Sequence, residues 1–98
     1  MAALTAIMDD IRDDLILGQL GLAAEGLSAR DIAEDTPLLD GGLAIDSVAA
    51  LDLLVAVEQK FGVRMPGFDK DFIRTTCATL GTLARFVESA VREKTAAP

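Results

Sequence analysis

The chain has 98 residues, and its 16 acidic against nine basic residues give a formal charge of -7 with no histidine. This length predicts one small domain. The negative charge argues against nucleic acid and anionic membranes as partners and favours a basic protein, while the absence of histidine removes the commonest general base and metal ligand.

The composition favours an all-α fold. Most of the hydrophobic residues are alanine and leucine, which are strong helix formers, and aromatic residues make up only 4% of the chain. The single cysteine, Cys77, cannot form a disulfide within the chain and fits a reducing compartment. The N-terminus carries aspartates where a signal peptide needs an apolar segment. We therefore expect a soluble, cytoplasmic protein.

The first predicted element is an amphipathic helix from about Leu4 to Leu20. Its apolar side is marked by residues at helical spacing: Leu4, Ile7, Met8, Ile11 and Leu15. The other side carries two i, i+4 pairs of aspartates, Asp9 with Asp13 and Asp10 with Asp14. These pairs form either a solvated acidic face near a helix N-terminus or a divalent-cation site. A straight helix does not wrap an ion, which favours the acidic face.

A long connection follows, from Leu22 to Asp46. Pro37 and the Gly41-Gly42 pair interrupt any continuous helix, and Ser28 with Asp31 predicts one short helical turn. Long connections in compact domains tend to be functional. We expect four apolar residues to hold this one on the core: Ile32, Leu38, Leu39 and Leu43.

The second helix is predicted to begin at Asp46 or Ser47 and to end near Phe61, with Gly62 as the residue that requires a positive φ. One stripe of apolar residues is expected to face the core: Val48, Leu51, Leu54, Val55 and Phe61.

Two further helices complete the prediction. A short one spans about Asp69 to Thr75, capped by Asp69 after Pro66 and Gly67. The last spans about Thr79 to Glu93, with apolar spacing at Leu80, Leu83, Ala84, Val87 and Val91. The expected organisation is a single free-standing domain over residues 1–93 and a loose tail over residues 94–98.

The Asp46-Ser47 pair is the candidate functional feature. With no histidine and no G-x-S-x-G motif, Ser47 is not a self-contained hydrolase nucleophile. The preceding glycines lack the G-K-[ST] ending of a nucleotide-binding loop. Two interpretations remain, a helix N-cap with no further role or a place where a phosphate is attached at a helix N-terminus. Cys77 is either a buried small residue or a reactive thiol.

The stretch DTPLLDGGLAIDSVAALDLLVAVEQKFGV, residues 35–63, resembles the acyl and peptidyl carrier proteins. In that family a DTPL loop and a glycine lead into a D-S-[LV] helix that ends near E-x-x-F-G. The later stretch FDKDFIRTTCATLGTLARFVESA is similar to the family's short third helix and final helix. The resemblance implies a four-helix bundle with three main helices, one short helix and a long loop between the first and second helices.

The resemblance also implies a role for each matched residue. Ser47 would carry 4′-phosphopantetheine, which a separate transferase attaches from coenzyme A with Mg²⁺, and the arm's thiol would hold acyl or aminoacyl groups as thioesters. Asp46 would help the transferase place its metal, and Val48 would pack on the partner or the arm. Asp52 and Glu58 would be recognition acids for partner enzymes. The chain would itself be no enzyme and would hold no metal.

Several positions depart from the carriers of fatty-acid synthesis. Ala49, Gln59 and Lys60 stand where those carriers tend to have acids, and Ala44 stands where many relatives have glycine. These departures favour a polyketide or nonribosomal-peptide pathway, with acyl- or aminoacyl-loading and condensing enzymes as partners of a monomeric carrier. The alternatives are a carrier of fatty-acid synthesis, an unmodified four-helix interaction module, and a carrier-like regulatory subunit that has lost its modification.

Overall fold

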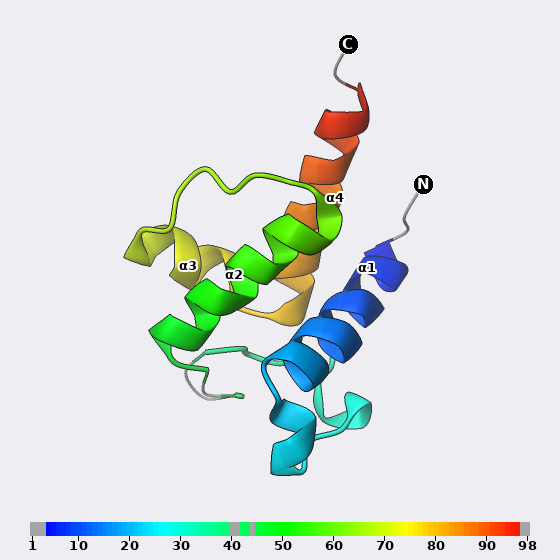
Figure 1. Ribbon diagram of the computed structural model, residues 1–98, viewed down its shortest axis with the longest axis vertical. Coiled ribbons are helices and arrows are strands. Elements are labelled where there is room, and N and C mark those ends of the chain that lie inside the picture. The colour runs from blue at the N-terminus through cyan, green and yellow to red at the C-terminus, as the bar shows by residue number, and fades with distance from the viewer. Residues whose placement is uncertain (1–3, 40–41, 44, 97–98) are drawn as a thin grey trace.

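A computed structural model describes residues 4–39, 42–43 and 45–96, and over these residues the fold is built from helices (Figure 1). A first helical rod comprises α1 (Leu4–Asp10) and η1 (Ile11–Gln19). Two 3₁₀ turns, η2 (Leu22–Glu25) and η3 (Ala29–Asp31), lie in the connection that follows. The chain ends with α2 (Ser47–Phe61), α3 (Lys70–Thr76) and α4 (Leu80–Ala96). Across the described ranges, no helix is long and apolar enough to cross a membrane.

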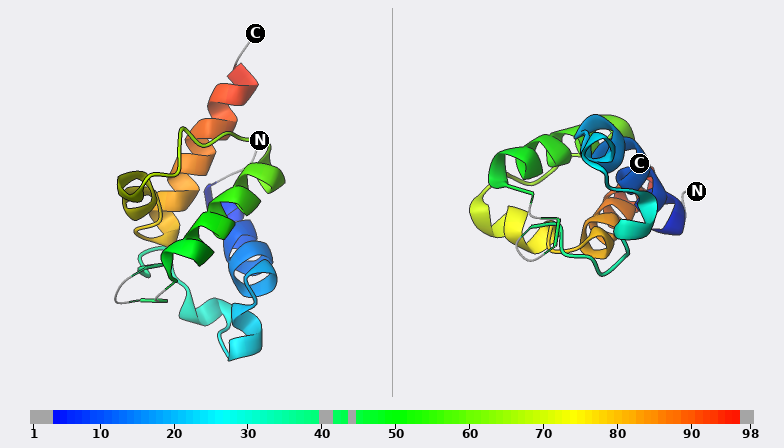
Figure 2. Two further views of the ribbon diagram at one scale, coloured as in Figure 1. Left: turned by 60° about the vertical axis from the view of Figure 1, so that its left-hand side comes forward. Right: turned by 90° about the horizontal axis from the view of Figure 1, so that it is seen from below.

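The first rod, α2 and α4 are the three long elements around the core, and α3 fills the side between α2 and α4 (Figures 1 and 2). The α1 part of the first rod packs against α4, and its η1 part packs against α2. This arrangement confirms the expected all-α bundle with one short helix and a long loop after the first helix.

The first rod has the predicted extent but a different local geometry in its second half. From Ile11 the backbone widens into a π-helix, and the amide of Leu20 donates to the carbonyl of Leu15, five residues earlier, at 2.8 Å. The wider turn brings residues five apart onto one face, and Ile11 and Ile16 are both fully buried. The helical spacing predicted Ile11 as a core residue and missed Ile16.

The long connection is fixed to the core by both side chains and backbone. Ile32 and Leu38 are buried, and Leu39 and Leu43 pack against the core. The amide of Leu38 donates to the carbonyl of Ala78 at 3.2 Å, which joins the loop to the start of α4. The predicted tether is therefore confirmed. Gly41 and Ala44, to which the sequence prediction gave roles in this loop, lie outside the described residues.

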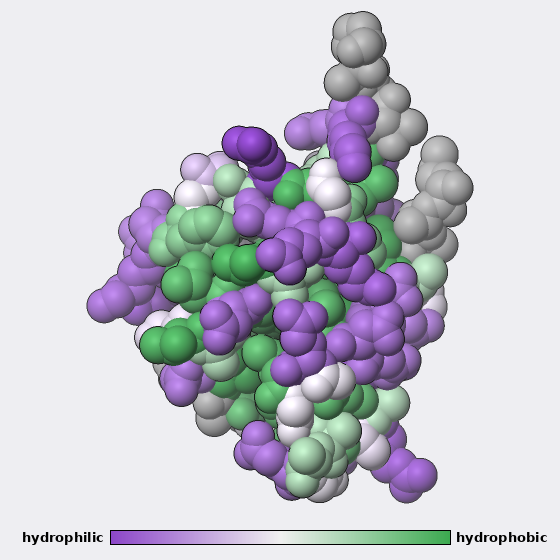
Figure 3. All heavy atoms as spheres, in the orientation of Figure 1, coloured by the Kyte–Doolittle hydropathy of each residue, from purple (hydrophilic) through white to green (hydrophobic). Residues whose placement is uncertain are grey.

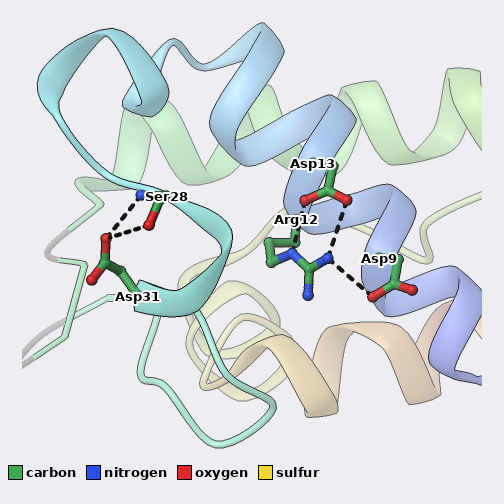
Figure 4. Close-up of polar contacts among 5 residues, drawn as sticks. All are labelled: Asp9, Arg12, Asp13, Ser28 and Asp31. Carbon is green, nitrogen blue, oxygen red and sulfur yellow. Dashed lines mark hydrogen bonds and ion pairs between the residues drawn. The ribbon is translucent and has the colours of Figure 1, made fainter.

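One predicted local feature of the connection is present, and a second feature was not predicted. Ser28 donates to Asp31 Oδ2 from its backbone amide at 2.8 Å and from its hydroxyl at 3.2 Å, which starts the η3 turn (Figure 4). At Gly42, a Cβ atom would lie 1.9 Å from the Pro37 carbonyl oxygen, so only glycine fits against this backbone.

The second helix has the predicted bounds but a different buried face. Gly62 adopts φ 66° and ends α2 as expected. The core side consists of Ala50, Leu53, Leu54, Ala56 and Val57. Of the predicted stripe, Leu54 is fully buried and Phe61 is partly buried, but Val48, Leu51 and Val55 are exposed. The prediction of a buried Val55 was wrong because α2 is apolar on nearly every side, so spacing alone does not select the face that meets η1 and α4.

The last two helices begin at side-chain caps. Asp69 accepts the amide of Phe72 at 2.8 Å at the start of α3, as predicted. Thr79 and Thr82 exchange amide-to-hydroxyl hydrogen bonds of 2.9 and 3.1 Å before α4. The backbone of α4 continues to Ala96, three residues beyond the predicted end of the last helix, and residues 97–98 lie outside the described chain. The loose tail stays a prediction.

Candidate functional site

The candidate site begins where the loop enters α2. Asp46 has extended backbone angles, φ −78° and ψ 171°, and its Oδ1 accepts the amide of Ala49 at 2.8 Å. Asp46 therefore caps the helix, as one of the two interpretations predicted. Ser47 is the first helical residue and is exposed, and its hydroxyl makes no hydrogen bond to another described residue. The serine is thus available for chemistry without a cost to the helix start.

A groove of about 540 Å³ lies beside Ser47, between the first turns of α2 and the α3 region. Its apolar lining comes from both sides of the groove and consists of Leu39, Ile45, Val48, Leu51, Phe68 and Ile73. Its polar lining consists of Asp46, Ser47, Lys70 and Arg74. The groove is open to solvent, and the face that contains α2 and α3 shows apolar atoms gathered there (Figure 3).

The exposed side of α2 carries an apolar stripe. Val48 is 70% exposed, Leu51 38% and Val55 37%, and these residues lie at positions i, i+3 and i+7 of the helix. Phe68, 40% exposed, extends the apolar surface toward α3. An exposed apolar patch of this kind marks a surface for a ligand or a partner protein. Of the predicted site residues, Ser47, Asp46 and Val48 therefore lie together.

The two predicted recognition acids differ in their surroundings. Asp52 is exposed on α2. Glu58 is only partly exposed, and its Oε2 accepts the amide of Met65 at 2.7 Å, which ties the chain after α2 back to the helix. Glu58 thus has a structural function that the sequence did not indicate.

The sequence prediction of the site missed seven residues of the groove: Leu39, Ile45, Leu51, Phe68, Lys70, Ile73 and Arg74. Lys70 and Arg74 are four residues apart on α3 and therefore share one side of that helix. This spacing was visible in the sequence, but the placement of α3 opposite Ser47 was not.

The acidic face of the first rod is largely ion-paired. Arg12 bridges Asp9 at 3.1 Å and Asp13 at 2.8 Å (Figure 4). The hydrogen bond from Arg12 lowers the pKa of Asp13. Asp14 accepts Lys60 Nζ of α2 at 2.9 Å, and this contact raises the pKa of Lys60. Within the described ranges, no group of three or more His, Cys, Asp or Glu residues is placed to hold a metal ion.

Cys77 is a buried core residue. Its side chain is fully excluded from solvent, and this burial raises the pKa of the thiol to about 12. The thiol is therefore neutral near neutral pH and not a nucleophile in the folded state.

The comparison with known families shows to which family the chain belongs. The model of a family described as phosphopantetheine attachment site matches residues 14–87, which include Ser47 and every groove residue named above. The chain belongs to the phosphopantetheine-binding carrier proteins. This confirms the family suggested by the resemblance, and it makes covalently attached 4′-phosphopantetheine the cofactor of the carrier.

A curated relative supports the same assignment. The carrier is 29% identical over 84 residues to an acyl carrier protein of Wolinella succinogenes, and the match covers 86% of this chain and 96% of the relative. No solved structure gives a significant match.

The groove and the helix start fit a phosphopantetheine group chemically. The group needs an accessible hydroxyl oxygen, which Ser47 offers, and a setting that tolerates an anionic phosphodiester. The N-terminus of the 15-residue helix α2 favours an anion, and Lys70 and Arg74 add positive charge across the groove.

Proposed function

We propose that Ser47 is the attachment residue and that this carrier holds acyl or aminoacyl intermediates as thioesters on its 4′-phosphopantetheine arm. The observation that supports the proposal most directly is the separation of two tasks at the start of α2. Asp46 caps the helix through the Ala49 amide, which leaves the exposed Ser47 hydroxyl free of a structural function. An arm attached there would begin at the edge of the apolar groove.

The neighbouring residues supply recognition rather than catalysis in this proposal. Asp46 holds its position through Oδ1, and Oδ2, which forms no hydrogen bond with another described residue, would be the oxygen offered to a metal bound by the transferase. Val48 projects into solvent and contacts the transferase or the arm. Asp52 and Glu58 are the acids of α2 that partner enzymes recognise, and Glu58 does so while it holds the Met65 amide.

The catalysis belongs to the partner enzymes. A serine hydroxyl is a weak nucleophile without an adjacent base, and the chain contains no histidine. The partners are a phosphopantetheinyl transferase, which attaches the arm, and the loading and condensing enzymes that use it. A cytoplasmic location and a monomeric state remain part of the same prediction.

The pathway we propose is a polyketide or nonribosomal-peptide type of specialised biosynthesis. On α2, Ala49, Gln59 and Lys60 replace the acids expected of a fatty-acid-synthesis carrier. The helix α2 itself contains only two acids, Asp52 and Glu58, and one base, Lys60, which pairs with Asp14 of the first rod. Partners that dock here would meet mainly the apolar stripe of Val48, Leu51 and Val55.

The test is intact-protein mass spectrometry before and after incubation with coenzyme A, Mg²⁺ and a broad-specificity phosphopantetheinyl transferase. We expect the wild-type chain to gain one phosphopantetheine group and the Ser47→Ala variant to gain none. Because Asp46 caps the helix, Ser47→Ala should keep the circular dichroism spectrum and melting temperature of the wild type. A wild-type mass that stays at the unmodified value with several transferases would overturn the proposal.

One observation favours a second candidate function, an unmodified protein-interaction module. The exposed apolar stripe on α2 would serve a partner protein equally well without an arm. The same experiment separates the two functions, since the interaction module does not react with coenzyme A and tolerates Ser47→Ala without loss of binding.

A further inference from the structure

Lys70 and Arg74 line the groove and, like Arg30, Arg64 and Lys94, form no ion pair among the described residues, whereas the other four cations do. Arg12, Lys60, Arg85 and Arg92 each form an ion pair with a carboxylate. Among the described residues, neither Lys70 nor Arg74 does so, although Asp69 and Asp71 flank Lys70 in sequence. Asp69 instead uses Oδ1 to cap α3. Within the described part of the chain, the two cations therefore line the groove with no carboxylate at ion-pair distance.

These two cations belong to the groove in which the arm would begin with its phosphodiester. Both line the same groove as Ser47, on its α3 side, and among the described residues Asp46 is the one acid of that lining. A phosphodiester on Ser47 would bring one further negative charge. The groove would then contain two negative and two positive groups, Asp46 and the phosphodiester against Lys70 and Arg74.

We propose that Lys70 and Arg74 hold the phosphodiester and turn the arm into the α2–α3 groove, an inference that rests on Ser47 being the attachment residue. Arg and Lys both bind phosphate oxygens through charge-assisted hydrogen bonds. The N-terminus of α2 attracts the same group from the other side. The apolar lining of Leu51, Phe68 and Ile73 then lies under the uncharged part of the arm. Lys70 and Arg74 are positioning residues, because they bind the arm and take no part in thioester chemistry.

The experiment compares apo and holo forms by ¹H–¹⁵N NMR, after mass spectrometry has shown that each sample carries the arm. In the wild type, conversion from apo to holo should shift the backbone amides of Val48, Leu51 and Ile73. In the Lys70→Gln/Arg74→Gln double variant these shifts should fall to less than about half, because the charge-assisted contacts to the phosphodiester are lost. The Lys70→Arg/Arg74→Lys double variant should recover them.

A matched control removes the same net charge elsewhere. Arg30 and Arg64 are exposed and do not line the groove, so the Arg30→Gln/Arg64→Gln variant should show the wild-type shifts. A salt titration of the wild-type holo protein needs no variant. The shifts at the groove amides should shrink between about 0.01 M and about 1 M sodium chloride, as the Debye length falls from roughly 30 Å to roughly 3 Å.

The outcomes distinguish this inference from the proposed function. If the arm attaches to Ser47 but the groove amides do not move, or move equally in the glutamine variant or at high salt, the groove inference is wrong and the carrier function stands. If no arm attaches to the wild type, the proposed function fails first, and the NMR comparison is not reached.

Discussion

The two faces of α2 have similar chemistry and opposite environments. On one face Leu53, Leu54 and Val57 are at most 1% exposed, and on the other Val48, Leu51 and Val55 are 37 to 70% exposed. Both faces consist of aliphatic side chains of comparable size. What separates them is the packing of η1 and α4 against the first face, while the second is left for the groove and for partners. An apolar side chain on this helix is therefore evidence for burial or for function, and only the neighbouring elements decide which.

The largest effect that tests this comparison comes from truncating a leucine on each face. Leu54→Ala should lower the free energy of unfolding by about 2 to 5 kcal/mol, because it leaves a cavity in the core. Leu51→Ala, the same change on the exposed face, should lower it by less than about 1 kcal/mol. Urea unfolding followed by circular dichroism measures both.

Val55→Ala extends this test to another of the three residues that the sequence assigned to the wrong face. Its effect should resemble that of Leu51→Ala, since Val55 is 37% exposed. Losses of similar size for Leu54→Ala and Val55→Ala would contradict the assignment of the two faces.

A second effect concerns the core between α3 and α4, where Cys77 is buried. Burial raises the pKa of the thiol from its ordinary value of 9.0 to about 12. Between these values the unfolded chain releases the proton and the folded chain keeps it. The free energy of unfolding should therefore fall with rising pH in this range, by about 1.4 kcal/mol per unit from this group. Below pH 9 the thiol contributes no pH dependence.

Denaturant titrations at several pH values check this expectation, with Cys77→Ala as the comparison. The alanine variant should be less stable overall but should lose this part of the slope above pH 9. A thiol reagent should also react with the native wild type near neutral pH only after urea is added. Rapid reaction of the native protein would show that Cys77 is accessible.

An effect smaller than those of the core positions is expected at Asp46, at the start of α2. Asp46→Ala removes the hydrogen bond to Ala49 and should cost about 1 kcal/mol of stability. Asp46→Asn keeps a capping oxygen and should stay within a few tenths of the wild type. If the carboxylate also serves the transferase, both variants should be loaded more slowly, as measured by mass spectrometry over time. Normal loading of Asp46→Asn would restrict Asp46 to its capping function.

The sequence predicted local structure well where a single side chain controls it. Asp46 and Asp69 begin their helices, Ser28 and Asp31 form one turn, and Gly62 ends α2, all as expected. Each of these features depends on hydrogen bonds or backbone angles within a few residues. The resemblance around Asp46-Ser47 indicated the carrier family for the same reason, because its motif is local and continuous.

The tertiary structure alone decided which residues meet across the fold. It placed Val48, Leu51 and Val55 outward, widened the first helix so that Ile16 entered the core, and assigned Glu58 to the Met65 amide. It also brought Lys70 and Arg74 of α3 into one groove with Ser47. These outcomes depend on the relative positions of helices distant in sequence. The amino-acid pattern of a single helix specifies that it has an apolar side, whereas packing against its neighbours determines which apolar residues stay exposed to bind an arm or a partner.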